Sequence, residues 1–136
     1  MTEKPNITKK GAPSIILVAE DDDISYALIE ILLSQRGNKI IRASTGKEAI
    51  EVFKENHNIS LILMDLKMPV MDGYEATVEI RKMDGEVPIL AQTAYALAGD
   101  DKKALSIGCN DYITKPIKKD DLLEKVESLL KQTSKN

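Results

Sequence analysis

The sequence predicts an α/β fold in which five helices doubly wind one five-stranded parallel sheet. Two observations lead to this prediction: short apolar runs alternate with stretches of helical periodicity from Ser14 onward, and no internal repeat or low-complexity segment interrupts them. Strands that alternate with helices form a parallel sheet covered on both faces, and right-handed crossovers distribute the helices over those faces. The 136 residues fit one domain.

The first two strands and the helix between them follow from local patterns. Residues 15–18 form a continuous apolar run, as expected of a strand buried on both faces, and residues 39–43 carry charged flanks that suit an edge strand. Gly37 and Asn38 end the helix between them. Its helical spacing is carried by Ile24, Ala27, Leu28 and Ile31.

Caps and periodicity indicate the remaining elements. A capping box of Thr45 and Glu48 opens the second helix, whose expected buried face consists of Ala49, Ile50 and Phe53. The later elements are a strand at 61–64, a helix at 73–83, a strand at 88–92, a helix at 99–107, a strand at 111–114 and a last helix carrying Leu122, Leu123, Val126, Leu129 and Leu130.

Composition excludes several classes of function. The net charge of −3 argues against a nucleic-acid surface, which needs a basic face, and no apolar run approaches the ~20 residues of a membrane span. The single cysteine fits a reducing, cytoplasmic compartment, or the cytoplasmic side of a membrane-bound kinase. Residues 1–13 are read as a flexible tail or linker, residues 14–132 as the folded domain and residues 133–136 as a second tail.

Polar side chains stand where four of the five predicted strands end. Glu20 and Asp21 follow the first strand, Asp65 the third, Thr93 the fourth and Lys115 the fifth. Doubly wound sheets bind ligands beyond the carboxyl ends of their strands. Each residue alone has a simpler explanation, such as a helix cap, a turn or a solvated charge. Those explanations do not predict that all of them meet at one edge.

Such a group of side chains suits phosphoryl chemistry. A hard divalent cation relieves the repulsion between carboxylates, and Mg²⁺ suits one or two of them plus waters. Mg²⁺ and an ammonium stabilise a transferring phosphoryl group, and a carboxylate can become an aspartyl phosphate. Asp65 is the predicted nucleophile because it stands on the central strand. Among the consecutive aspartates, Asp21 is assigned to the metal because it lies where the apolar run of the first strand stops. For Asp22 and Asp23, capping of the next helix is as good an explanation as a role in the site.

The polar strand ends belong to four motifs, at residues 18–23, 63–73, 92–94 and 112–116. These motifs resemble those of response-regulator receiver domains, and the resemblance covers about residues 14 to 130. The Glu20-Asp21 pair is similar to receivers of hybrid sensor histidine kinases. It implies a flavodoxin-like sheet with strand order 2-1-3-4-5. It also implies a receiver in a two-component phosphorelay.

The resemblance also assigns roles in a metal and acceptor site. Asp65 would accept the phosphoryl group. Mg²⁺ would be the cofactor, bound directly by Asp21 and Asp65, through water by Glu20, and by the main-chain carbonyl of Lys67. A chain with these residues would catalyse its own phosphorylation and dephosphorylation without being a turnover enzyme.

The remaining roles concern signalling. Thr93 and Lys115 would bind phosphoryl oxygens, Tyr112 would be an aromatic switch that follows Thr93, and the bond before Pro116 would be cis. Tyr95 would sit over the mouth of the site. The face built from the fourth helix, fifth strand and last helix would change on phosphorylation, and a dimer through that face is a further expectation.

The expected phosphodonor is a histidine kinase or phosphotransfer protein, with small phosphodonors as a second source. The only histidine, His57, is expected at the surface and not as a phosphohistidine. The parent chain is expected to be a hybrid sensor kinase, with a stand-alone regulator as the alternative.

Three other functions compete with phosphoacceptance. A degenerate receiver that binds partners without phosphate is the main alternative. A phosphatase of the haloacid-dehalogenase type would need a second aspartate at the position of Lys67, and a nucleotide-binding domain would need a G-x-x-x-x-G-K-[ST] loop, which does not occur.

Overall fold

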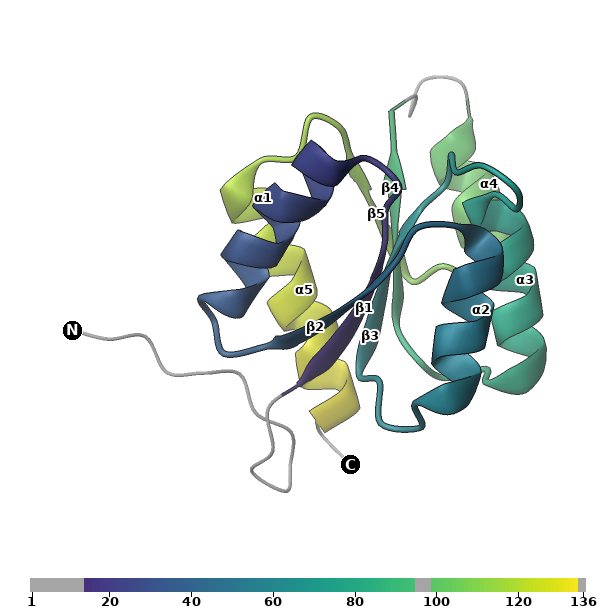
Figure 1. The fold of residues 1–136 in the computed structure, drawn as a ribbon, viewed down its shortest axis with the longest axis horizontal. Helices are drawn as coiled ribbons and strands as arrows, with labels where there is room; N and C mark the ends of the chain where they lie inside the picture. The colour runs from purple at the N-terminus through teal and green to yellow at the C-terminus, as the bar shows by residue number, and fades with distance from the viewer. Residues whose placement is uncertain (1–13, 95–98, 135–136) are drawn as a thin grey trace.

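The computed structural model describes residues 14–94 and 99–134, which form one parallel sheet in the order β2-β1-β3-β4-β5 (Figure 1). The strands are β1 (Ile15–Ala19), β2 (Lys39–Ala43), β3 (Leu61–Asp65), β4 (Ile89–Thr93) and β5 (Asp111–Thr114). These bounds confirm the predicted strands to within one residue at each end. The charged second strand lies at the edge of the sheet, as expected.

Helices cover both faces of the sheet. They are α1 (Asp23–Ser34), α2 (Gly46–Glu55), α3 (Gly73–Met83), α4 (Asp100–Ser106) and α5 (Lys119–Ser134). Helices α1 and α5 lie on one face and α2, α3 and α4 on the other (Figure 1). Each face has its own buried apolar cluster. Because successive side chains of a strand point to opposite faces, β1 and β3 serve both clusters, which explains their continuous apolar runs.

Helix α1 has two apolar faces, and the one that marked it in the sequence points outward. Ile24 is 82% exposed, Leu28 46% and Ile31 55%. The face packed on the sheet consists of Ile29, Leu32 and Leu33. Helical spacing identified the helix correctly, but spacing alone does not say which of two apolar faces meets the core.

Two glycines lie so close to neighbouring backbone that they fix the start of α3 beside the end of β3. A Cβ atom on Gly73 would overlap the carbonyl oxygen of Asp65, and one on Gly46 would overlap the carbonyl oxygen of Met71. Asp72 caps α3, because its Oδ1 accepts from the N–H of Glu75 at 2.9 Å. Glycine at position 73 therefore lets α3 begin directly against the strand that carries Asp65.

The predicted ends of the domain are only partly described. Residues 1–13 and 135–136 lie outside the described residues, whereas α5 continues through residues 133 and 134. Helix α4 spans residues 100–106, one residue shorter at each end than predicted. The buried face predicted for α2 is confirmed: Ala49 is fully buried, and Ile50 and Phe53 pack against the same cluster.

Candidate functional site

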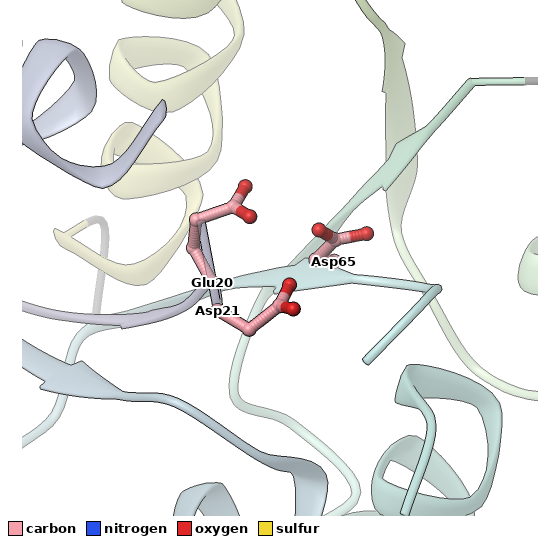
Figure 2. A group of neighbouring side chains, drawn as sticks. All are labelled: Glu20, Asp21 and Asp65. Carbon is pink, nitrogen blue, oxygen red and sulfur yellow. The ribbon is translucent and has the colours of Figure 1, made fainter. Parts of the chain in front are cut away.

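Three carboxylates meet at the carboxyl ends of β1 and β3. One oxygen each of Glu20, Asp21 and Asp65 lies within 4.8 Å of the others, and Figure 2 shows the three side chains converging from the two strands. Glu20 is fully buried, Asp65 is nearly so, and Asp21 is exposed. The adjacent Asp22 has a different task, because its Oδ2 accepts from the N–H of Ser25 at 2.8 Å and caps α1.

Lys115, directly after β5, contacts two of the three carboxylates. Its Nζ lies 2.8 Å from Oδ2 of Asp65 and 3.3 Å from Oε1 of Glu20. The peptide bond between Lys115 and Pro116 is cis. Burial works to lower the pKa of Lys115, but the hydrogen bond and charge of Asp65 outweigh it, so the pKa is raised. The ammonium therefore stays charged at neutral pH.

The surroundings of Glu20 disfavour its charged form and raise its pKa. Burial, followed by the charge of Asp65, raises its pKa from an ordinary 4.5 to about 7. Its Oε1 lies near Lys115, yet accepts no hydrogen bond from the described residues. A buried oxygen without such a bond, beside two further carboxylates, is what a hard divalent cation would satisfy. The donor set therefore fits Mg²⁺.

Asp65 is held by donors on both of its oxygens. The N–H of Lys67 donates to Oδ1 at 3.0 Å, and Lys115 donates to Oδ2 at 2.8 Å. The buried Thr93, at the end of β4, lines a cavity of about 140 Å³ together with Asp65 and Lys115. The space for a group bound to Asp65 is thus bordered by a hydroxyl and an ammonium. The role of the Lys67 carbonyl as a metal ligand stays a prediction.

Tyr112 lies on the opposite face of the sheet from Asp65. It is half-buried on β5, packs against the cluster beneath α2 to α4, and pairs through its Cα with Ala91 of β4. Thr93 lies two residues farther along β4, so the two predicted switch residues stand on neighbouring strands. Tyr95, expected over the mouth of the site, lies outside the described residues.

The sequence prediction gave no role to the buried polar residue Gln92, although it lies in the motif at residues 92–94. Gln92, between Ala91 and Thr93, is fully buried, and neither its Oε1 nor its Nε2 has a hydrogen-bond partner in the described part of the chain. It borders the 140 Å³ cavity. It also borders an apolar groove of about 460 Å³ that runs between α1 and Pro116. The sequence feature that could have indicated its importance is a polar amide next to the apolar residues of β4.

The whole domain resembles known receivers. The sequence model of a protein family, the response regulator receiver domain, matches residues 16–127. The chain is 44% identical to hybrid signal transduction histidine kinase I of Dictyostelium discoideum, an alignment that covers 77% of this chain and 6% of that protein. Within the described residues, no helix is long and apolar enough to cross a membrane.

Two solved structures share the fold closely. One is the receiver domain of a sensor histidine kinase from Pseudomonas aeruginosa with a magnesium ion coordinated in its active site cleft; it has 36% identity and a TM-score of 0.82, and the match covers 88% of this chain and 99% of that one. The other is the Saccharomyces cerevisiae receiver domain of Ssk1 in complex with the phosphotransfer protein Ypd1, with 32% identity, a TM-score of 0.83 and coverages of 89% and 91%. With its fold, its acidic edge and its family match in agreement, this chain belongs to the response regulator receiver domains of two-component systems.

Proposed function

We propose that the domain accepts a phosphoryl group on Asp65, with Mg²⁺ bound by Glu20, Asp21, Asp65 and the main-chain carbonyl of Lys67. The observation that carries this proposal is the convergence of three carboxylates within 4.8 Å beside a lysine ammonium. Three carboxylates and the Lys115 ammonium lose hydration when they are placed at the end of a buried sheet, so the cluster is not explained by a gain in stability. A site for a divalent cation and a phosphoryl group explains all four.

In the transfer step, a carboxylate oxygen of Asp65 attacks the phosphorus of the donor. A P–O bond to Asp65 forms while the P–N bond of a phosphohistidine breaks, and the electron pair leaves with the imidazole nitrogen. With acetyl phosphate the leaving group is acetate. Lys115 places positive charge beside the oxygens that become more negative in the transition state. Bound Mg²⁺ would neutralise further charge on those oxygens.

Hydrolysis reverses the modification. Water attacks phosphorus, inorganic phosphate leaves, and the carboxylate of Asp65 is regenerated. The domain therefore catalyses its own phosphorylation and dephosphorylation, and signalling, not turnover, is its function. Thr93 binds one phosphoryl oxygen, and Tyr112 follows its movement. A modest bias between two existing states is enough to alter the α4-β5-α5 face, through which two copies would pair.

The proposed main donor is a protein, either a histidine kinase or a phosphotransfer protein, with small phosphodonors as a second source. Three observations support a protein donor. Apolar side chains of α1, Ile24 and Leu28, are exposed beside the site. The apolar groove that they border reaches Lys115. A relative of this fold was solved with a phosphotransfer protein. We further propose that the domain acts in the cytoplasm as part of a hybrid sensor kinase.

Mass spectrometry of the intact protein tests the proposal. Incubation with Mg²⁺ and acetyl phosphate should add one phosphoryl group to the wild type, and EDTA or the Asp65→Asn change should abolish the adduct. Asp84→Asn, at the other end of the sheet beside Val87, is the matched control and should leave the adduct unchanged. Absence of an adduct on the wild type would favour the phosphate-independent receiver.

A further inference from the structure

The inference concerns Gln92 and rests on the metal site of the proposed function. Both polar atoms of this amide are excluded from solvent, and neither has a hydrogen-bond partner in the residues that the structure describes. A buried amide without partners is unfavourable, and an apolar side chain of similar size would avoid that penalty. Gln92 is therefore best explained by a second state of the site in which the amide is paired.

The fold places Gln92 between the phosphoacceptor and the lysine. In the sheet, its Cα pairs with that of Asp65 on one side and with that of Ile113 on the other. Paired residues of parallel strands point to the same face, and Lys115 lies two residues beyond Ile113. Gln92 and Lys115 border both the 140 Å³ cavity and the apolar groove. The amide thus faces the same small space as the ammonium.

The lysine and the cation would compete for the same atoms. Lys115 now contacts Oδ2 of Asp65 and Oε1 of Glu20, two carboxylates that also belong to the acidic group suited to Mg²⁺. With Mg²⁺ bound to these oxygens, the Lys115 ammonium would lose acceptors in a partly buried place. It would then need another oxygen nearby. The side-chain carbonyl oxygen of Gln92 is an uncharged acceptor in that space, and it has no hydrogen-bond partner to give up within residues 14–94 and 99–134.

We propose that Gln92 is a positioning residue that accepts a hydrogen bond from Lys115 when Mg²⁺ occupies the acidic site. Without Mg²⁺ the amide has no hydrogen-bond partner among the described residues; with Mg²⁺ bound, the Lys115 ammonium would become its partner. Gln92 thereby lowers the free-energy cost of moving the lysine from the carboxylates. It holds the ammonium close enough to meet a phosphoryl group that arrives on Asp65.

A double-mutant cycle on Mg²⁺ affinity, measured by isothermal titration calorimetry, tests this proposal. Gln92→Leu should weaken Mg²⁺ binding about fivefold, the size of one net hydrogen bond. In the Lys115→Met background, where no ammonium needs a new acceptor, the same change should have no effect on Mg²⁺ affinity. Leu90→Met, which alters an apolar residue of the same strand and face, is the control and should leave Mg²⁺ affinity unchanged in both backgrounds.

Thermal unfolding without Mg²⁺ supplies a second measurement. Gln92→Leu should raise the melting temperature of the metal-free protein, because it removes a buried amide that no described residue pairs with. Gln92→Met, with an unbranched side chain, should do the same if leucine packs badly. A lower melting temperature in both variants would show that the amide is already satisfied without the cation, and would overturn the proposal.

The possible outcomes separate this inference from the proposed function. If the wild type binds no Mg²⁺, the metal site itself is wrong, and the role of Gln92 falls with it. If the wild type binds Mg²⁺ and Gln92→Leu has the same affinity, only the positioning role is wrong. An equal loss of affinity with and without the Lys115 ammonium would also overturn it, because the effect would then not pass through the lysine.

Discussion

The two halves of the edge that carries the site differ in how their polar groups are paired. The acidic half, from β1 and β3, brings together Glu20, Asp21 and Asp65, and Lys115 is the ammonium that contacts two of them. The polar half, from β4 and β5, includes Gln92, whose amide has no hydrogen-bond partner in the described part of the chain. The acidic half has an excess of negative charge, and the polar half has unused hydrogen-bonding capacity.

This difference separates two tasks. Carboxylates in excess of nearby cations create an affinity for a divalent ion. A buried amide and a lysine that can exchange partners create a part of the site that rearranges. Changes in the acidic half should therefore alter Mg²⁺ binding directly. Changes in the polar half should alter what happens to the phosphoryl group, and should alter Mg²⁺ binding only where they act through Lys115.

The largest expected effect is in the acidic half. Asp21→Asn removes a charged ligand, so Mg²⁺ affinity should fall by about a hundredfold, and phosphorylation by acetyl phosphate should slow with it. Calorimetric titration measures the first effect. Asp22→Asn is the matched control, because Asp22 caps α1, and it should bind Mg²⁺ normally. If Asp22→Asn lost the metal and Asp21→Asn kept it, the assignment of the ligand would be wrong.

The next largest effect should come from Lys115, whose removal should raise Mg²⁺ affinity and lower the rate of phosphorylation. Lys115→Met removes the ammonium that now occupies oxygens of Glu20 and Asp65, so Mg²⁺ should bind more tightly. The rate of phosphorylation at saturating Mg²⁺ should nevertheless fall by about tenfold, the size of a hydrogen bond to a charged group. Weaker Mg²⁺ binding in this variant would show that the lysine and the cation do not compete.

A smaller effect should appear as pH dependence of stability. Folding raises the pKa of Glu20 to about 7 through burial and then the charge of Asp65. The native state thus holds this proton more tightly than the unfolded chain, so without Mg²⁺ the free energy of unfolding should decrease as pH rises from about 4.5 to about 7. The loss should be on the order of 2 kcal/mol by urea denaturation.

The control for this pH dependence is Glu20→Gln, which cannot titrate and should flatten the curve. Saturating Mg²⁺ should flatten it as well, because the cation favours the ionised carboxylate. A free energy of unfolding that increased with pH over this interval, and did so equally in the Gln variant, would contradict the assignment to Glu20.

The smallest effect should come from the hydroxyl of the polar half. Thr93→Ala removes one neutral hydrogen bond to the phosphoryl group, so affinity for beryllium trifluoride, a stable analogue of that group, should fall by about fivefold. Mg²⁺ affinity without the analogue should not change. Thr93→Ser, which keeps the hydroxyl, should behave as the wild type. A fall in Mg²⁺ affinity in the alanine variant would contradict the assignment of the Thr93 hydroxyl to the phosphoryl group alone.

The sequence predicted the acidic half better than the polar half for a physical reason. Glu20, Asp21 and Asp65 are charged residues directly after apolar strands, and parallel topology brings strand ends together. Gln92 was missed because it is inside a strand, where its significance depends on the absence of hydrogen-bond partners. The outward face of α1 was not predicted either, since Ile24 and Ile29 are equally apolar and only packing tells which is buried.

Chemical trapping of the acyl phosphate identifies the residue that accepts the phosphoryl group. After phosphorylation with acetyl phosphate and Mg²⁺, borohydride reduces an aspartyl phosphate to homoserine, and peptide mass spectrometry locates the change. We expect homoserine at position 65 and at no other aspartate. Modification at Asp21 or Asp22, or phosphate found on His57 instead, would contradict it.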